Sequence, residues 1–226
     1  MSPQEIEQFH RDGVLRLPGF HARARLAQSA ARLRDEAQRR LATASFARAL
    51  RKLPVFQQIT RLSGALTAGE LDRVLLTPEL TARVGELAGR APLGGQGAQV
   101  LASPPRQGAW TLDGLGWHVD LAADPQQQRV PGIQAFFLVD DVAPRGGATL
   151  ALAGSHRATP GDLRAALRAR DAGLEARLAA LGVRVVEMCG RAGDTYLMDM
   201  RVLHAPAVNA TPNLRLMATC RCLFAD

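Results

Sequence analysis

The chain has 226 residues, of which 47% are hydrophobic and 22% charged, and its formal net charge is +7. A chain of this length can bury a sizeable core, so we expect a single domain over residues 1–226. The sequence contains no run of about 18 apolar residues, which excludes a transmembrane helix and a membrane partner. Its first residues lack the basic and apolar regions of a signal peptide, and we expect a cytoplasmic protein.

The first part of the chain, residues 1–97, is predicted to be mainly helical. Over residues 3–12 and about 21–42, apolar residues recur at spacings of three and four, which is the period of an amphipathic helix. A third helix is predicted over 78–89, because this stretch follows a threonine and begins with proline and glutamate, a helix-start signal. The sequence pattern predicts no individual element between the second and third of these helices.

From residue 98 to residue 226 the pattern changes to short apolar runs separated by Gly and Pro, which is typical of β-strands. A helical insert is expected at about 160–181. The predicted fold class is mostly β with flanking helices: a double-stranded β-helix (jelly roll, cupin-like) whose N-terminal helices pack on one sheet. The predicted strands are 98–102, 132–139, 147–152, 183–188, 194–199 and 213–224.

The last predicted strand, 213–224, has the clearest alternation of side chains. Leu214 and Leu216 begin an apolar series on one face, which we expect to pack against the helices. Arg215 falls on the other face, which we place toward the mouth of the jelly roll. A guanidinium there can hold a carboxylate through two parallel hydrogen bonds, so Arg215 is a candidate anion-binding residue.

The segment Trp117-His118-Val119-Asp120 contains a His-x-Asp unit, and His204 follows later in the chain. On an extended strand, residues i and i+2 point to the same side, so His118 and Asp120 can bind one ion together. Two imidazoles and one carboxylate can occupy one face of an octahedral Fe(II) and leave the opposite face open, as in non-heme iron oxygenases. His118, Asp120 and His204 are therefore candidate metal ligands.

Four further passages accompany these residues. Residues 140–149 contain Pro-Arg-Gly-Gly, residues 154–157 read Gly-Ser-His-Arg, and residues 193–199 begin with Gly-Asp. The opening, residues 5–20, contains Asp-Gly-Val and Leu-Pro-Gly. Together with the His-x-Asp unit, the distal histidine and the arginine after it, these passages resemble the phytanoyl-CoA dioxygenase (PhyH) family of Fe(II)/2-oxoglutarate-dependent oxygenases.

The resemblance implies an Fe(II) cofactor held by His118, Asp120 and His204, with 2-oxoglutarate and O2 as cosubstrates. Arg215 stands where the arginine of the family binds the distal carboxylate of 2-oxoglutarate. A hydroxyl that the family commonly places two residues after the distal histidine is missing, because that position is Pro206. Candidate cosubstrate-binding residues besides Arg215 are Thr111, Thr149, Thr219 and Phe136.

The reaction implied by the resemblance is hydroxylation of an unactivated C–H bond of a small molecule, with release of succinate and CO2, in natural-product tailoring or catabolism. Related halogenases carry a small residue in place of the carboxylate ligand, so Asp120 favours hydroxylation; desaturation, epoxidation and cyclisation use the same chemistry. We expect the substrate to be chosen by residues 43–115, 121–132 and 155–182, which would also form a lid. Candidate substrate-binding residues are Trp110, Asp113, Trp117, Gln134 and Arg201.

The arginine-rich segment from Arg23 to Arg61 bears on the partners. A basic surface raises the local concentration of anions, so the substrate can be anionic or bound to a carrier. The alternative is that these charges only keep the helix faces soluble, as charged helix faces usually do. A nucleic-acid demethylase would also suit a basic chain, but only 4% of the residues are aromatic, too few for stacking bases, and no nucleic acid is expected. A non-catalytic metal-binding jelly roll, acting as a sensor or subunit, is the alternative that Pro206 supports. The sequence allows a monomer or a homodimer.

Overall fold

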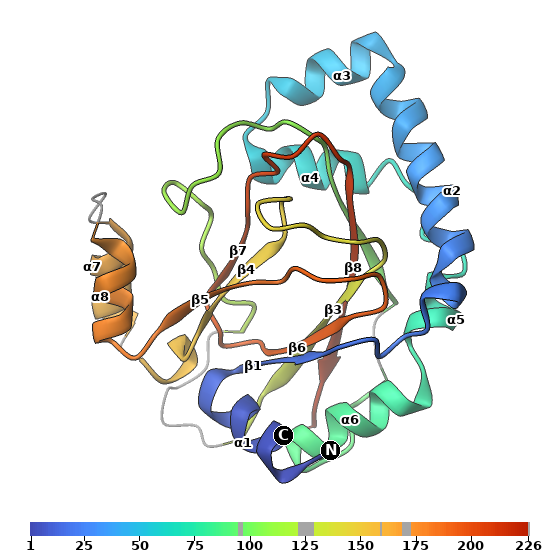
Figure 1. Ribbon diagram of the computed structural model, residues 1–226. Helices are drawn as coiled ribbons and strands as arrows, with labels where there is room; N and C mark the ends of the chain where they lie inside the picture. Colours follow the sequence, from blue (N-terminus) through green and yellow to red (C-terminus); the bar gives the residue numbers. More distant parts are fainter. Residues whose placement is uncertain (95–96, 122–128, 159, 169–172, 226) are drawn as a thin grey trace.

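The computed structural model describes residues 1–94, 97–121, 129–158, 160–168 and 173–225 (Figure 1). Its N-terminal part is helical apart from one strand that the sequence pattern does not predict, β1 (Val14–Leu17). The helices are α1 (Pro3–Asp12), α2 (Arg23–Ala42), α3 (Ala44–Arg51), α4 (Val55–Ser63), α5 (Leu71–Leu75) and α6 (Pro78–Ala88). The helices predicted at 3–12, 21–42 and 78–89 are therefore confirmed.

Local capping explains where α1 begins and ends and where α6 begins. α1 starts with a capping box, in which the backbone N–H of Glu5 donates to the Ser2 side chain and that of Ser2 to the Glu5 side chain. It ends at Gly13, whose φ of +69° is the left-handed conformation of a helix terminus. Thr77 caps α6 by accepting a hydrogen bond from the Leu80 N–H at 3.2 Å.

Together with β1, seven further strands among the described residues form two antiparallel sheets, as the predicted jelly roll requires. Five strands pair in the order β1-β6-β3-β8-β2, and three pair in the order β5-β4-β7. Figure 1 shows α2, α5 and α6 beside the five-stranded sheet and α7 and α8 next to β5. The strands are β2 (Gln99–Ser103), β3 (Gly132–Leu138), β4 (Thr149–Ala153), β5 (Arg184–Glu187), β6 (Thr195–Asp199), β7 (His204–Pro206) and β8 (Arg215–Leu223). All six predicted strands are present.

The larger sheet divides its side chains between a core and a cavity. Phe137 on β3 and Leu216 on β8 belong to a buried apolar cluster that includes Leu33 of α2 and Leu71 of α5. Arg215, one residue away on β8, lines a cavity on the opposite face. The predicted alternation of β8 is confirmed, and the N-terminal helices cover the apolar face of this sheet.

The insert expected at about 160–181 contains two helices, α7 (Pro160–Arg168) and α8 (Leu174–Ala180), and residues 169–172 between them lie outside the described residues. A 3-10 turn, η1 (Ser155–Arg157), precedes the insert. Both helices cover β4 by packing apolar side chains against it; the cluster comprises Leu152, Leu163, Ala166, Leu174, Leu178 and Val183. Among the described residues, none of the helices has the length and apolar character needed to span a membrane.

Phe137 gives a direct test of this packing, since its side chain is 0% exposed. Phe137→Ala should lower the free energy of unfolding by about 3–5 kcal/mol, because it leaves a cavity between the sheet and the helices. Urea unfolding followed by circular dichroism measures the loss. Phe56→Ala is the matched control, because Phe56 is 54% exposed and should cost much less. Equal losses in the two variants would contradict the packing described.

Candidate metal centre

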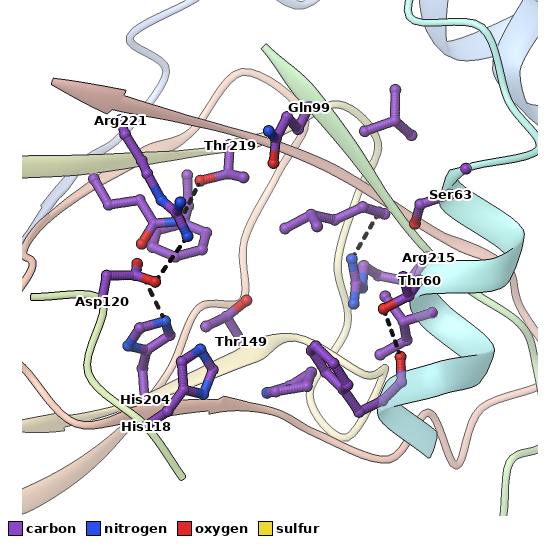
Figure 2. Close-up of a pocket in the computed structure, with 18 residues that line it drawn as sticks. Thr60, Ser63, Gln99, His118, Asp120, Thr149, His204, Arg215, Thr219 and Arg221 are labelled. Carbon is purple, nitrogen blue, oxygen red and sulfur yellow. Dashed lines mark hydrogen bonds and ion pairs between the residues drawn. The ribbon is translucent and has the colours of Figure 1, made fainter. Parts of the chain in front are cut away.

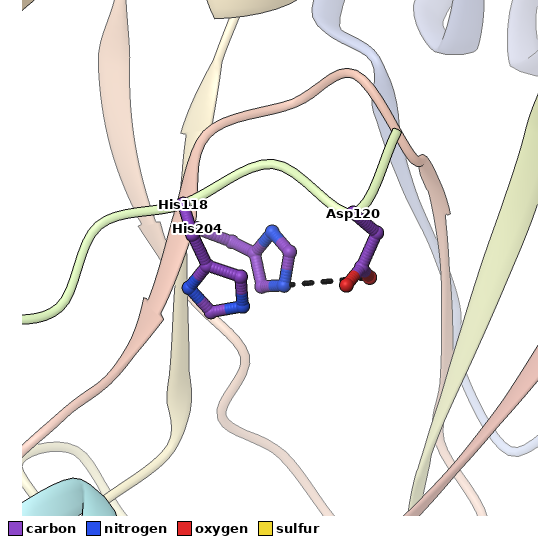
Figure 3. Close-up of side chains that lie close together, drawn as sticks. All are labelled: His118, Asp120 and His204. Carbon is purple, nitrogen blue, oxygen red and sulfur yellow. Dashed lines mark ion pairs between the residues drawn. The ribbon is translucent and has the colours of Figure 1, made fainter. Parts of the chain in front are cut away.

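Three side chains, those of His118, Asp120 and His204, converge at one end of the cavity. Each offers one ligand atom, and the three atoms all lie within 4.8 Å of one another (Figure 3). The Nε2 atom of His204 lies 3.7 Å from Oδ2 of Asp120, and both side chains are buried, with 5% and 6% of their surfaces exposed. This donor set could hold a metal ion.

Backbone hydrogen bonds bring these ligands together. The N–H of His118 donates to the His204 carbonyl at 3.0 Å, and the N–H of His204 donates to the His118 carbonyl at 2.9 Å. The two imidazole centroids are consequently only 4.3 Å apart. Asp120 is fixed separately, because its N–H donates to the Met200 carbonyl at 3.1 Å. His118 takes part in an isolated bridge and not in the extended strand that the sequence suggests.

The protonation of the two imidazoles fits metal binding. Nδ1 of His118 lies 2.8 Å from the Gly116 carbonyl, and Nδ1 of His204 lies 3.1 Å from the Val202 carbonyl. A carbonyl only accepts hydrogen bonds, so each Nδ1 carries the proton and each Nε2 keeps a lone pair for a metal. Burial, together with the neighbouring His118, lowers the pKa of His204 to about 4, which keeps this imidazole neutral at pH 7.

The carboxylate of Asp120 also fits a metal. Its Oδ2 atom is buried and has no hydrogen-bond partner among the residues that the structure describes. A buried carboxylate oxygen without a partner is costly, so an additional cation would compensate it. The other oxygen, Oδ1, accepts a hydrogen bond from Nη2 of Arg221 at 2.9 Å.

Two of the sequence motifs hold neighbouring parts of the fold. In the Gly-Ser-His motif, the Ser155 hydroxyl accepts a hydrogen bond from the Leu203 N–H at 2.8 Å, directly before His204. In the Gly-Asp motif, Asp194 accepts hydrogen bonds from Arg16 at 2.6 Å and from the Gly19 N–H at 2.7 Å, and thereby joins the N-terminal passage to the sheet. These contacts give the two motifs a structural role, because they hold the backbone of neighbouring segments in place.

The triad opens into a cavity of about 450 Å³ that is lined by both sheets and by α4. Figure 2 shows Arg215 near α4, on the far side of the cavity from the triad, with Thr149 between them. The predicted residues that line this cavity are His118, Asp120, Gln134, Phe136, Thr149, His204, Arg215 and Thr219. The same cavity is therefore lined by the three candidate metal ligands and by the cationic side chain of Arg215.

Arg215 is a buried cation with no carboxylate partner among the described residues. Its side chain donates from Nε to the Gly147 carbonyl and from Nη1 to the Leu101 carbonyl, both at 2.7 Å, and only 3% of the residue is exposed. Burial lowers the pKa of Arg215 to about 9, which still leaves the guanidinium charged at pH 7. Gly147 has a φ of +77°, and a Cβ there would lie 2.7 Å from that of Asn209, which explains the glycine of this motif. Among the described residues, the charge of Arg215 is thus balanced by no carboxylate and is stabilised by two carbonyl oxygens.

Five predicted residues are not among those that line the cavity. Thr111 accepts a hydrogen bond from the Asp113 N–H at 2.9 Å in a turn, which engages its hydroxyl elsewhere. Trp117 packs against the cluster under α7 and α8, and Arg201 pairs with Asp199 at 2.6 Å. The ring of Trp110 lies under the Arg145 guanidinium, 5.8 Å from ring centroid to Cζ. The structure thus places these residues around the site and not in the cavity.

The lining residues that the sequence prediction misses include Arg221 and a wall formed by α4. Arg221 could have been found, since it shares the alternating face of β8 with Arg215. The wall formed by Phe56, Ile59 and Thr60 of α4 carries no such signal, because it depends on how this helix packs against β2. α4 lies within residues 43–115, where substrate selection is expected. Among the described residues of 155–182, none lines the cavity, and the middle of 121–132 lies outside the described residues.

Comparison with known families now identifies the chain. Residues 9–217 match the model of the family described as phytanoyl-CoA dioxygenase (PhyH). The chain belongs to this family. The match runs from the N-terminal passage to beyond Arg215, so it includes every residue of the triad.

Individual relatives agree with this family and with the fold. The chain is 28% identical to an ectoine dioxygenase of Nocardia farcinica (strain IFM 10152) over 169 residues, which cover 65% of this chain and 57% of that relative. The chain thus spans little more than half the length of this curated relative. SnoK, an alpha ketoglutarate dependent carbocyclase from nogalamycin biosynthesis, matches with a TM-score of 0.64 and 18% identity over 100% of this chain and 85% of its own. The epimerase SnoN, solved with Fe3+, alpha ketoglutarate and nogalamycin RO, matches with a TM-score of 0.59 and 22% identity. This match covers 98% of this chain and 83% of the SnoN chain. These solved structures confirm the jelly-roll fold with flanking helices.

His204→Ala tests the metal centre. The variant should lose measurable Co(II) binding in calorimetric titration, because one of three donors is removed, and should keep its fold by circular dichroism. His10→Ala is the control, because His10 lies on the exposed side of α1, and it should bind metal like the wild type. Unchanged binding by His204→Ala would show that the metal is held elsewhere.

Proposed function

We propose that the protein is an Fe(II)/2-oxoglutarate-dependent oxygenase that hydroxylates an unactivated C–H bond of a small molecule in natural-product tailoring or catabolism. The observation that carries this proposal is one cavity with a 2-His-1-carboxylate set at one end and the buried, uncompensated Arg215 at the other. In such enzymes the bound iron, with 2-oxoglutarate and O2, supplies the oxidation of the substrate and releases succinate and CO2.

His118 and His204 would hold the iron through Nε2 and Asp120 through Oδ2, the atoms that the hydrogen bonds described above leave available. Three protein donors leave part of the coordination sphere open for the cosubstrate and O2. The carboxylate of Asp120 occupies the position that a halogenase would leave to chloride, which supports hydroxylation. The solved relatives include a carbocyclase and an epimerase, so the reaction type is proposed from this residue and not from the fold.

Arg215 would bind the distal carboxylate of 2-oxoglutarate. Its guanidinium is already oriented by the Gly147 and Leu101 carbonyls, so little side-chain freedom remains to be lost on binding. An incoming carboxylate would also neutralise a charge that otherwise stays buried and unpaired. This role agrees with the position of Arg215 across the cavity from the triad (Figure 2).

Thr149 would supply the hydroxyl that Pro206 cannot. Thr149 on β4 pairs directly with Pro206 on β7, and paired side chains on neighbouring strands lie about 5 Å apart. The Thr149 side chain makes no hydrogen bond with the described residues and lines the cavity. The Thr219 hydroxyl, in contrast, already donates to the Ala135 carbonyl at 2.9 Å. The hydroxyl of Thr149, on the strand paired with Pro206, would therefore replace the hydroxyl that the family commonly places at the position of Pro206.

The substrate would enter between the triad and α4. Phe56 and Ile59 of α4 and Phe136 of β3 give this part of the cavity an apolar wall that can position a C–H bond and exclude water. Thr60, Ser63 and Gln134 add polar groups in the same cavity. This mixed lining suits a small organic molecule better than a nucleic-acid base, which needs aromatic stacking.

The decisive experiment is an anaerobic titration of metal-free protein with Fe(II) and then 2-oxoglutarate. A weak visible charge-transfer band that saturates at one equivalent of 2-oxoglutarate is the expected result, and a substrate screen by succinate release would follow. Iron binding without this band would favour a non-catalytic metal-binding jelly roll. Failure to bind iron at all would contradict the metal centre itself.

Arg215→Leu should raise the concentration of 2-oxoglutarate needed for half-saturation roughly 100-fold, because hydrogen bonds to a charged group are lost. Arg215→Lys keeps the charge but not the fork of donors, and should fall between the wild type and the leucine variant. Fe(II) affinity without 2-oxoglutarate is the control and should stay unchanged. An unchanged 2-oxoglutarate requirement in Arg215→Leu would show that the anchor lies elsewhere.

Thr149→Val keeps the shape of the side chain and removes its hydroxyl. It should weaken 2-oxoglutarate binding roughly tenfold, the loss of one hydrogen bond to a charged group. Thr60→Val is the matched control in the same cavity, because the Thr60 hydroxyl already donates to the Phe56 carbonyl at 3.1 Å. The charge-transfer titration measures both variants, and equal affinities would exclude Thr149 as the replacement for the missing hydroxyl.

A further inference from the structure

The two oxygens of the Asp120 carboxylate have different surroundings. Oδ1 accepts a hydrogen bond from Nη2 of Arg221 at 2.9 Å, and Oδ2 faces His204 at 3.7 Å. Figure 2 shows the Arg221 side chain reaching across the cavity wall to this carboxylate. The Asp120 side chain is 6% exposed, whereas that of Arg221 is 44% exposed. Arg221 and His204 thus approach different oxygens of the same carboxylate.

We infer that Arg221 is a positioning residue that makes Asp120 a ligand through one oxygen only. This inference rests on the proposed metal centre. A carboxylate can bind a metal through one or both oxygens, and the terminal torsion of aspartate is broad, so the side chain alone selects neither mode. The guanidinium engages Oδ1 and fixes the plane of the carboxylate, which leaves Oδ2 as the donor.

The backbone on both sides of this ion pair is fixed. Arg221 lies on β8, which is paired with β3, and its partner in the register is Gln134. Asp120 lies in a loop whose N–H groups at Asp120 and Leu121 both donate to the Met200 carbonyl at 3.1 Å. The ion pair therefore connects a loop to an interior strand of the sheet, and holds the carboxylate against a rigid support.

Binding through one oxygen matters for the open face of the metal. An octahedral ion held by three protein donors keeps three positions, enough for a cosubstrate that chelates through two atoms and for O2. Binding through both oxygens of Asp120 would leave one position fewer. Arg221 would thus preserve the position at which O2 binds, without touching the metal itself.

The test uses Co(II), whose visible absorption reports the number and arrangement of its ligands. Arg221→Gln should change the absorption spectrum of the bound Co(II) and weaken its binding about 10- to 100-fold, the usual effect of losing a residue that orients a metal ligand. Arg221→Lys retains a cationic donor and should restore the wild-type spectrum at least in part. Circular dichroism of both variants checks that they remain folded.

Arg23→Gln is the matched control. Arg23 pairs with Asp141 at 3.1 Å on the surface, with 62% and 52% of the side chains exposed, so the variant removes the same charge and a similar ion pair elsewhere. It should bind Co(II) as the wild type does. A wild-type spectrum and affinity in Arg221→Gln would overturn the inference. A wild-type protein that binds no Co(II) would instead overturn the proposed metal centre, so the two failures are distinguishable.

Discussion

Two reciprocal backbone hydrogen bonds between His118 and His204 are the constraint on which the site depends. They attach a loop to β7 and thereby bring together two imidazoles from distant parts of the sequence. β7 is in turn held by its pairing with β4, and Ser155 binds the residue before His204. The metal centre is therefore a product of strand pairing, and its side chains need few further contacts to be in place.

Alternate side chains of β8 contribute to the cavity on one face and to the hydrophobic core on the other. Leu216 and Ala218 face the helices and belong to the core, whereas Arg215, Thr219 and Arg221 face the cavity. A slip of one residue in the register of β8 would exchange the two faces and bury three polar side chains against the helices. The same pairing therefore maintains both the core and the arrangement of the cavity.

The parts of the protein that could be predicted from the sequence are those with local signals. Helical periodicity, strand alternation and the His-x-Asp unit each depend on residues close in the chain, and they lead to the fold class, to His118 and Asp120 and to the face on which Arg215 lies. The distal ligand, His204, follows from the resemblance to the family. The wall formed by α4 and the pairing of Thr149 with Pro206 depend on tertiary packing. For the same reason Trp110, Thr111, Asp113, Trp117 and Arg201 are near the triad in sequence or motif but do not line the cavity.

The wall formed by α4 has a consequence for how such a protein can change over evolutionary time. β7 and β8 supply His204 and Arg215, and a loop bonded to β7 supplies His118 and Asp120. In contrast, α4 comes from the helical N-terminal part and shares none of the hydrogen-bonded strand pairs. Phe56, which lines the cavity, is 54% exposed and contributes little to the core. Substitutions on this helix face can therefore change the shape of the cavity beside the triad at little cost in stability. The candidate metal ligands and this part of the cavity wall are thus encoded in separable parts of one chain.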